Sequence, residues 1–265
     1  MYSGGLHGPS GDQPGELHNT SATAYLRLFM DATSGNRQAQ YDLAAWHMKR
    51  VEVQEKDCAE LLQALQWYRT AATAGHACAQ YRYGLFFEHG WVVACDDQAA
   101  ERWIRQGLKQ CDGKLIETLI REAGADDADA LNALGCAYFF GYGVEQDNER
   151  CFALWKRAAA LGSARGFYHL SCAYHSGTGT EPDTELSIAC CRTACELGMG
   201  IAAHRMGLRY LHGNGVSINH DQAYQFFRLG VLRGYSLSLG ALRFCLAAGL
   251  TRGSRSQIGG RKEDA

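Results

Sequence analysis

A repeat of 36 residues constrains the fold of this chain more than any other feature of its sequence. Gly162, Gly198 and Gly234 are each separated by this interval. The same interval relates three further sets of residues: Gly141, Gly177 and Gly213; Gly143, Gly179 and Gly215; Tyr138, Tyr174 and Tyr210. A fixed period of this size is typical of solenoids, in which each repeat packs against its neighbours. The sequence therefore predicts a solenoid.

Each repeat is expected to form a helical hairpin. In residues 130–138 (ALNALGCAY), apolar or small residues at i, i+4, i+5 and i+8 mark one face of a helix. Gly141 and Gly143 then end this first helix and turn the chain. Residues 151–162 form the second half, an amphipathic helix that ends in glycine. This pattern predicts an all-α fold with about five hairpins.

Glycine also recurs in the middle of the first helices, at Gly135 and Gly207. A glycine inside a helix costs about 1 kcal/mol relative to alanine, so its repetition needs a structural reason. We expect a neighbouring helix to approach the backbone so closely at these positions that no side chain fits.

The repeats are expected to fill residues 20–250. Residues 1–19 and 251–265 are rich in polar residues and glycine and lack apolar periodicity, which predicts two disordered tails. The second and third units are separated by an insertion, in which Lys114–Ala123 has the pattern of an additional helix. The loop of the first unit, around Val51–Lys56, is also longer than the others.

Both ends of the solenoid need a cap, because an end repeat has no neighbour to cover its apolar face. A short helix over Ser21–Met30, with Thr20 or Ser21 as its N-cap, is expected at one end. At the other end, residues 238–249 repeat the pattern of a first helix without a second helix after it.

The repeat resembles that of the Sel-one-like repeat (SLR) family, relatives of the tetratricopeptide repeats. The resemblance rests on the string A-x-x-x-L-G-x-x-Y-x-x-G-x-G-V and the following helix W/Y-x-x-A-A-x-x-G, and it covers Ala39 to Gly249. The first two units depart from it, with Arg50-Val51-Glu52 and Gly90-Trp91-Val92 in place of the Gly-x-Gly turn. The resemblance implies a right-handed α-α superhelical solenoid that binds proteins or peptides, usually as a non-catalytic adaptor or scaffold.

Charge and composition exclude several other classes of protein. The net charge is −2 and the isoelectric point about 6.5, whereas nucleic-acid binders are usually strongly basic. No apolar stretch is long enough to span a membrane. The N-terminus lacks the basic and apolar regions of a secretory signal, so we expect a cytoplasmic protein whose eleven cysteines are free thiols.

No motif in the sequence predicts catalysis, a cofactor or a metal. The Gly-x-Gly pairs follow helices rather than strands and lack the Lys-Ser/Thr of a nucleotide-binding loop. Cys191 and Cys195 are one helical turn apart, but no second pair completes a zinc site. No catalytic Cys/His pattern, paired carboxylates or Gly-x-Ser-x-Gly elbow is present.

A partner is expected to bind in the concave groove lined by the first helices. Positions −1, +2, +3 and +6 from the first alanine of each unit point away from the core side of the helix. Tyrosine, arginine and histidine recur at these positions, and the first two of these residue types are favoured in interfaces. The candidate binding residues are Tyr41, Tyr81, Arg82, Asn132, Arg165, Tyr168, His169, His204 and Arg205.

The predicted function is a non-catalytic scaffold for a protein or peptide partner. Arg82, Arg165 and Arg205 gather on one predicted surface of an acidic chain, which favours a partner with an acidic segment. Two alternatives remain open: an SLR-type hydrolase or binder of cell-wall or β-lactam-like ligands, and a secreted effector that binds a host protein. A closed pocket with strongly shifted pKa values would favour the first of these.

Overall fold

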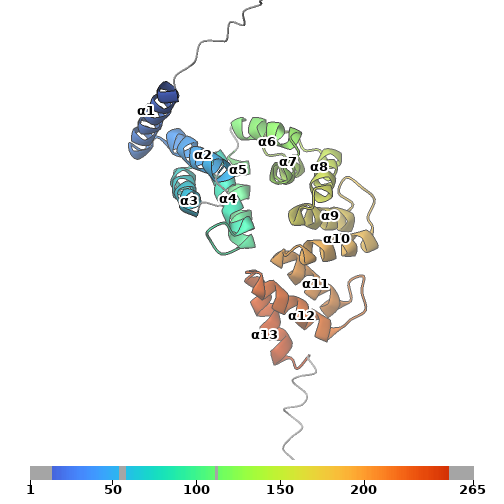
Figure 1. Ribbon diagram of the computed structural model, residues 1–265. Coiled ribbons are helices and arrows are strands. Elements are labelled where there is room, and N and C mark those ends of the chain that lie inside the picture. Colours follow the sequence, from blue (N-terminus) through green and yellow to red (C-terminus); the bar gives the residue numbers. More distant parts are fainter. Residues whose placement is uncertain (1–13, 54–57, 111–112, 251–265) are drawn as a thin grey trace, which may run out of the picture. The chain divides into compact units, whose positions relative to one another are not determined.

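The structure is a computed structural model that describes residues 14–53, 58–110 and 113–250. Every regular element in these ranges is a helix, which confirms the predicted all-α fold (Figure 1). The helices are α1 (Pro14–Thr33), α2 (Arg37–Val53), α3 (Cys58–Thr73), α4 (Ala77–His89), α5 (Asp97–Lys109), α6 (Lys114–Gly124), α7 (Ala128–Phe140), α8 (Asn148–Ala160), α9 (Ala164–Ser176), α10 (Thr184–Glu196), α11 (Gly200–His212), α12 (His220–Leu232) and α13 (Leu237–Ala247).

Five helical hairpins carry the repeat: α2–α3, α4–α5, α7–α8, α9–α10 and α11–α12. Helix α6 is the predicted insertion, and α13 is the predicted helix after the last hairpin. The chain forms two compact units, here called unit 1 (Met1–His76) and unit 2 (Ala77–Ala265). None of the described helices is long and apolar enough to be a candidate membrane span.

Glycine ends the first helices as predicted. Gly141, Gly177 and Gly213 adopt left-handed backbone conformations, with φ of 71°, 73° and 76°, directly after α7, α9 and α11. This region of φ carries a steric penalty for residues with a Cβ atom and none for glycine. The second helices then begin at equivalent N-caps, Asp147, Asp183 and Asn219, whose side chains accept from backbone N–H groups.

The glycines inside the first helices leave no room for a side chain, as predicted, but an aromatic side chain of the second helix fills the space rather than its backbone. A methyl group on Gly135 would lie 2.7 Å from Cδ1 of Trp155, and one on Gly207 would lie 2.6 Å from the Phe227 ring. Both distances are shorter than any ordinary carbon–carbon contact. The absence of a side chain therefore lets a large aromatic ring from the second helix pack against the first.

The N-terminal helix is longer than expected. Helix α1 begins at Pro14, so the predicted tail of residues 1–19 overlaps it. Thr20 and Ser21 lie inside the helix, so the prediction that either is its N-cap is wrong. Residues 1–13 and the predicted tail 251–265 lie outside the described residues.

The first repeat also departs from its predicted loop. Helix α2 continues to Val53, through the first half of the stretch Val51–Lys56 that was expected to be a loop. Residues 54–57 lie outside the described residues.

Unit 2 contains contacts that a strictly neighbour-to-neighbour solenoid does not predict. Glu88 at the end of α4 pairs with Arg165 of α9, with 2.6 Å between Oε1 and Nε. Asp97 at the start of α5 accepts from the backbone N–H of Ile201 in α11, at 3.0 Å. Ser236, just before α13, donates to Gln98 at 2.7 Å. Helices α4 and α5 thus contact the first helices of later repeats.

The contact from Asp97 supplies a cap that α11 lacks in its own sequence. Asp127 and Ser163 cap α7 and α9 with their side chains, and the equivalent residue before α11 is Met199, which has no side-chain cap hydrogen bond. The first N–H groups of a helix need an acceptor from outside the helix. Asp97 provides one from a helix 104 residues earlier in the chain.

Candidate functional site

Tyr41 is the one predicted binding residue in unit 1. Its ring stacks on His76, with 4.8 Å between the ring centroids and an angle of 10° between the planes. It also packs at a tilt against Tyr68, at 5.7 Å. The side chain is half-buried, so part of it remains accessible on unit 1.

Tyr81 and Asn132 do not face a groove, and the expectation that their side chains are accessible is wrong. Each residue is only 1% exposed. Tyr81 lies where α5 packs on α4, since a methyl group on Gly107 would lie 2.9 Å from the Tyr81 backbone nitrogen. Asn132 donates from Nδ2 to the Ser163 hydroxyl at 2.8 Å. Helices α4 and α7 are buried on nearly every side because they pack against several neighbours at once.

Arg82 is half-buried and forms an ion pair with Glu122. Glu122 belongs to α6, the helix inserted between the second and third hairpins. Burial raises the pKa of Glu122, an effect that the charge of Arg82 opposes. The positive charge of Arg82 is therefore compensated within unit 2.

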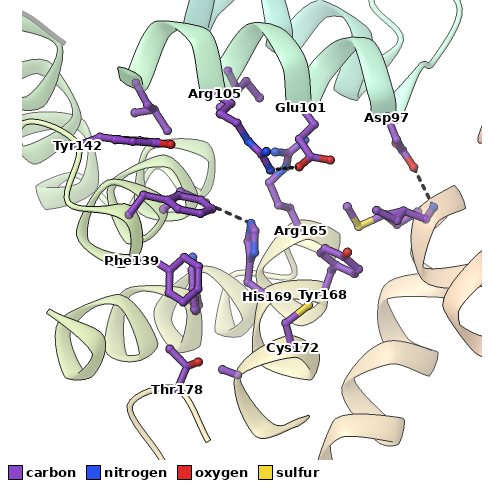
Figure 2. A pocket seen from close by; sticks show the side chains of 18 of the residues that line it. Asp97, Glu101, Arg105, Phe139, Tyr142, Arg165, Tyr168, His169, Cys172 and Thr178 are labelled. Atoms are coloured by element: carbon purple, nitrogen blue, oxygen red, sulfur yellow. Dashed lines mark hydrogen bonds and ion pairs between the residues drawn. The ribbon is translucent and has the colours of Figure 1, made fainter. Parts of the chain in front are cut away.

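Arg165, Tyr168 and His169 line a pocket of about 180 Å³ in unit 2 (Figure 2). Its walls come from α5, α7, α8, α9 and α11 together with the turns after α7 and α9 and the N-cap of α11. Most of the lining is apolar or aromatic, including Ile104, Leu108, Phe139, Tyr142, Trp155 and Met199. A cavity of 150 Å³ holds a benzene ring, so this pocket has room for one apolar side chain.

The mouth of the pocket is more polar than its walls. Arg105 and Glu101 form an exposed ion pair there, and the Arg105 guanidinium also lies over the Phe140 ring at 5.5 Å. Ser176 at the end of α9 is exposed and lies on the same rim. The exposed residues at this rim show that the pocket is open to solvent rather than enclosed.

Arg165 lies at the inner side of the pocket with its charge already paired. Its side chain is 11% exposed and that of its partner Glu88 is 15% exposed. Burial raises the pKa of Glu88, and Arg165 opposes this effect. The second carboxylate oxygen of Glu88 is buried and has no hydrogen-bond partner among the residues that the structure describes. The buried carboxylate of Glu88 therefore depends on Arg165 for compensation of its charge.

His169 is held in its neutral form. Its ring stacks on Trp155 at 4.8 Å, and its Nε2 lies 3.5 Å from the Cys136 sulfur. Burial, together with the charges of Arg165 and Arg205, lowers the pKa of His169 to about 3. Burial raises the pKa of Cys136 to about 12. A nucleophilic cysteine needs a lowered thiol pKa, so this pair is not an activated Cys/His couple.

Replacing His169 with phenylalanine is expected to make the stability of the protein less sensitive to acid. Between the ordinary histidine pKa of 6.5 and the folded value of about 3, the unfolded chain binds a proton that the folded chain does not. The free energy of unfolding therefore falls as pH decreases through this range. Between pH 7.5 and pH 5, the wild type should lose about 2 kcal/mol more than the variant.

Urea unfolding of both proteins at the two pH values measures this difference. His169→Phe keeps a ring on Trp155, so its comparison with the wild type isolates the titration. His175→Phe, on the exposed side of the same helix, is the matched control for losing an imidazole. Equal acid sensitivity in the wild type and His169→Phe would contradict the prediction.

The remaining two predicted residues lie on α11. Arg205 donates from Nη1 to the Cys172 sulfur at 2.7 Å, and its guanidinium lies over the Tyr168 ring at 5.4 Å. His204 contacts the Ser238 hydroxyl through Nδ1 at 3.2 Å. Burial lowers the pKa of His204. Arg205 therefore borders the pocket through two of its lining residues, while His204 faces α13.

A second and larger cavity, of about 770 Å³, lies at the helix ends of unit 2. Its lining includes four carboxylates, and each already has a partner. Glu88 pairs with Arg165, and Asp97 accepts from a backbone N–H of α11. Asp127 caps α7, and Asp129 lies 2.7 Å from a nitrogen of His89. The acidic groups of this cavity thus serve the fold, so we do not assign the binding site to it.

The structure brings together Arg165, Tyr168, His169 and Arg205 and separates the other predicted residues from them. Sequence reasoning missed the contributions of Phe139, which the repeat pattern does not include, and of Trp155, which the pattern includes only as part of the second helix. It also missed Asp97, because the contact of this residue depends on a helix far along the chain. Among the described residues, no group of three or more histidine, cysteine or acidic side chains could hold a metal.

A family model described as Sel1 repeat matches five segments of the chain, residues 37–76, 79–110, 128–163, 168–199 and 200–235. These segments coincide closely with the five helical hairpins. No curated protein matches the sequence.

The chain is similar to several solved structures at low sequence identity. A protective antigen of uropathogenic Escherichia coli with an SLR fold is 23% identical, with a TM-score of 0.48 over 86% of this chain and 52% of that chain. A Sel1 repeat protein from Oxalobacter formigenes is 22% identical, with a TM-score of 0.48 over 88% of this chain and 89% of that chain. A Sel1 repeat protein from Klebsiella pneumoniae is 16% identical, with a TM-score of 0.34 over 83% of this chain and 98% of that chain. The chain thus spans about half the length of the first.

Proposed function

The chain belongs to the Sel1 repeat family, and from this membership we propose that it is a non-catalytic scaffold that binds a peptide segment of a partner protein at the pocket of unit 2. Proteins of this family generally mediate protein–protein interactions. The observation that carries the proposal is the open, aromatic-lined pocket of about 180 Å³ between the helices of unit 2. An apolar side chain of the partner would fill it and anchor the segment.

The geometry favours an anchor pocket for two reasons. Phe139, Tyr142 and Trp155 present large apolar faces that a ligand side chain would remove from water. The walls come from separate hairpins that are already packed against one another, so binding requires little ordering of the scaffold. Interfaces commonly draw most of their affinity from one such central anchor.

An enzymatic function has one observation in its favour, because the pocket holds groups with strongly shifted pKa values. The directions of the shifts argue against reactivity. The Cys136 thiol keeps its proton and His169 is a weak base. Burial raises the pKa of Asp97, whose carboxylate already accepts from the backbone of α11. We therefore assign binding to the pocket rather than hydrolysis.

The proposal includes a role as a cytoplasmic adaptor. The alternative of a secreted effector would use the same pocket on a host protein. Detection of the chain in culture supernatant without cell lysis would favour the effector, and its confinement to the cell fraction would support the adaptor.

Selection of peptides on the intact protein tests the proposed function. Random dodecapeptides displayed on phage are selected against the full chain, and the selected peptides are synthesised and their affinities measured. Ser176→Trp places an indole at the rim of the pocket, so we expect it to weaken peptide binding at least tenfold. Gln225→Trp, on the exposed side of α12, is the matched control and should bind as the wild type does.

Helical circular dichroism of both variants verifies that they are folded. If the selected peptides bind Ser176→Trp as tightly as the wild type, the pocket is not the binding site. If no peptide is selected, the scaffold function itself is contradicted.

A further inference from the structure

Among the described residues, two half-buried arginines of α11 have no carboxylate partner, whereas Arg82 and Arg165 in unit 2 each pair with one. Arg205 and Arg209 are one helical turn apart. Arg205 donates to the sulfur of Cys172 at 2.7 Å. Arg209 donates from Nη2 to the Ser187 hydroxyl at 2.6 Å and from Nη1 to the backbone carbonyl of Asn214 at 3.3 Å. All of these acceptors are uncharged groups.

The contrast with the rest of unit 2 is clear. Arg82 pairs with Glu122, and Arg165 pairs with Glu88. Within the described residues, neither arginine of α11 has a carboxylate partner. A guanidinium that is partly removed from water loses hydration energy, and a carboxylate is the partner that best restores it through two parallel hydrogen bonds.

The position of Arg205 connects its charge to the pocket. Cys172 and Tyr168, which Arg205 contacts, both line the pocket (Figure 2). Burial raises the pKa of the Cys172 thiol, and both Arg205 and Arg209 act against this effect. The positive charge of Arg205 therefore lies beside a thiol that lines the pocket, and that thiol carries no negative charge that would compete with a ligand.

We propose that Arg205 binds the carboxylate of an acidic side chain in the partner segment that occupies the pocket. This inference rests on the proposed function and adds the charge of the partner to it. Of the three arginines that the sequence assigned to an acidic partner, Arg82 and Arg165 are neutralised within the protein. Arg205 retains its charge for a ligand, and Arg209, one helical turn further along α11, also has no carboxylate partner among the described residues.

The test uses synthetic peptides obtained by the phage selection. We expect an Asp or Glu in the selected sequences, and its replacement by Asn or Gln should weaken binding to the wild-type protein at least tenfold. In Arg205→Met, which keeps the apolar part of the side chain, the same replacement should change the affinity less than twofold. Arg205→Lys should retain part of the preference for the acidic peptide, because it keeps the charge.

Arg228→Met, on the exposed side of α12, is the matched control for the loss of one positive charge. It should keep the full preference for the acidic peptide. Raising the salt concentration from 50 to 500 mM should weaken binding of the acidic peptide to the wild-type protein. Binding of the amide-substituted peptide should remain nearly unchanged. Free-acid and amidated C-termini distinguish a side-chain carboxylate from a terminal one. The proposal expects no difference between them.

Three outcomes would overturn the inference. The first is a set of selected peptides that depend on the pocket but bind equally well after Asp or Glu is replaced. The second is an equal loss of preference in Arg228→Met, and the third is binding that requires the free C-terminus. In each of these cases the apolar anchor could still be correct, because Ser176→Trp tests it separately. If Arg205→Met does not fold, the peptide replacements on the wild type and Arg205→Lys still decide the question.

Discussion

Replacing Arg165 with methionine is expected to lower the free energy of unfolding by about 3–5 kcal/mol. The loss comes mainly from Glu88, whose carboxylate is buried beside the pocket and pairs with Arg165 at 2.6 Å. Without Arg165, this group must either stay charged and unpaired in the interior or take up a proton. The pair also joins α4 to α9, which are 77 residues apart in sequence at the point of contact.

Urea unfolding at neutral pH, followed by circular dichroism, measures this loss. Arg150→Met is the matched control, because Arg150 is 67% exposed and its ion pair with Asp147 should contribute less than about 1 kcal/mol. Adding Glu88→Gln to Arg165→Met should recover part of the lost stability, since it removes the unpaired charge. A loss below about 1 kcal/mol in Arg165→Met would show that the pair is not buried in solution.

Replacing Trp155 with alanine is expected to cost about 3–5 kcal/mol, the usual range for removing a large aromatic side chain from a core. Trp155 is only 3% exposed, and its ring packs against His169 and Phe139. The cavity left behind would merge with the pocket, because the indole forms part of its wall. Urea unfolding of the variant measures the cost.

The effect of replacing Gly135 on stability should depend on whether Trp155 is present. Gly135→Ala alone should destabilise the protein, because the new methyl group would lie 2.7 Å from Cδ1 of Trp155. In the Trp155→Ala background the ring is gone, and the same replacement should become neutral or stabilising by up to about 1 kcal/mol through its helix propensity. If Gly135→Ala changed stability by the same amount and in the same direction in both backgrounds, the Trp155 ring would not be the reason why residue 135 is glycine.

The repeat itself was predictable because its rules are local. Gly141 follows α7 in the left-handed conformation that its place in the period required. The period also predicted the close contact at Gly135, since a glycine that recurs inside a helix needs a nearby neighbour. Even the inserted helix α6 was visible in the sequence, as an amphipathic segment between two repeats.

The binding surface was only partly predictable. Arg165, Tyr168 and His169 line the pocket, and Arg205 borders it. Tyr81 is buried instead, because a helix packed on several sides has no free face for a periodic pattern to predict. The partner of Arg82 lies in α6, which is outside the repeat, so the period contained no signal for that ion pair.

The amino-acid sequence by itself determined the helices, their turns and the hairpin in which each pair of helices packs. These depend on residues within one repeat, where glycine conformation, N-caps and apolar spacing act over a few turns of helix. Only the tertiary structure decided which charges are compensated and where a pocket opens. Those properties depend on contacts such as that of Asp97 with Ile201, between residues 104 positions apart, and no local pattern specifies such a contact.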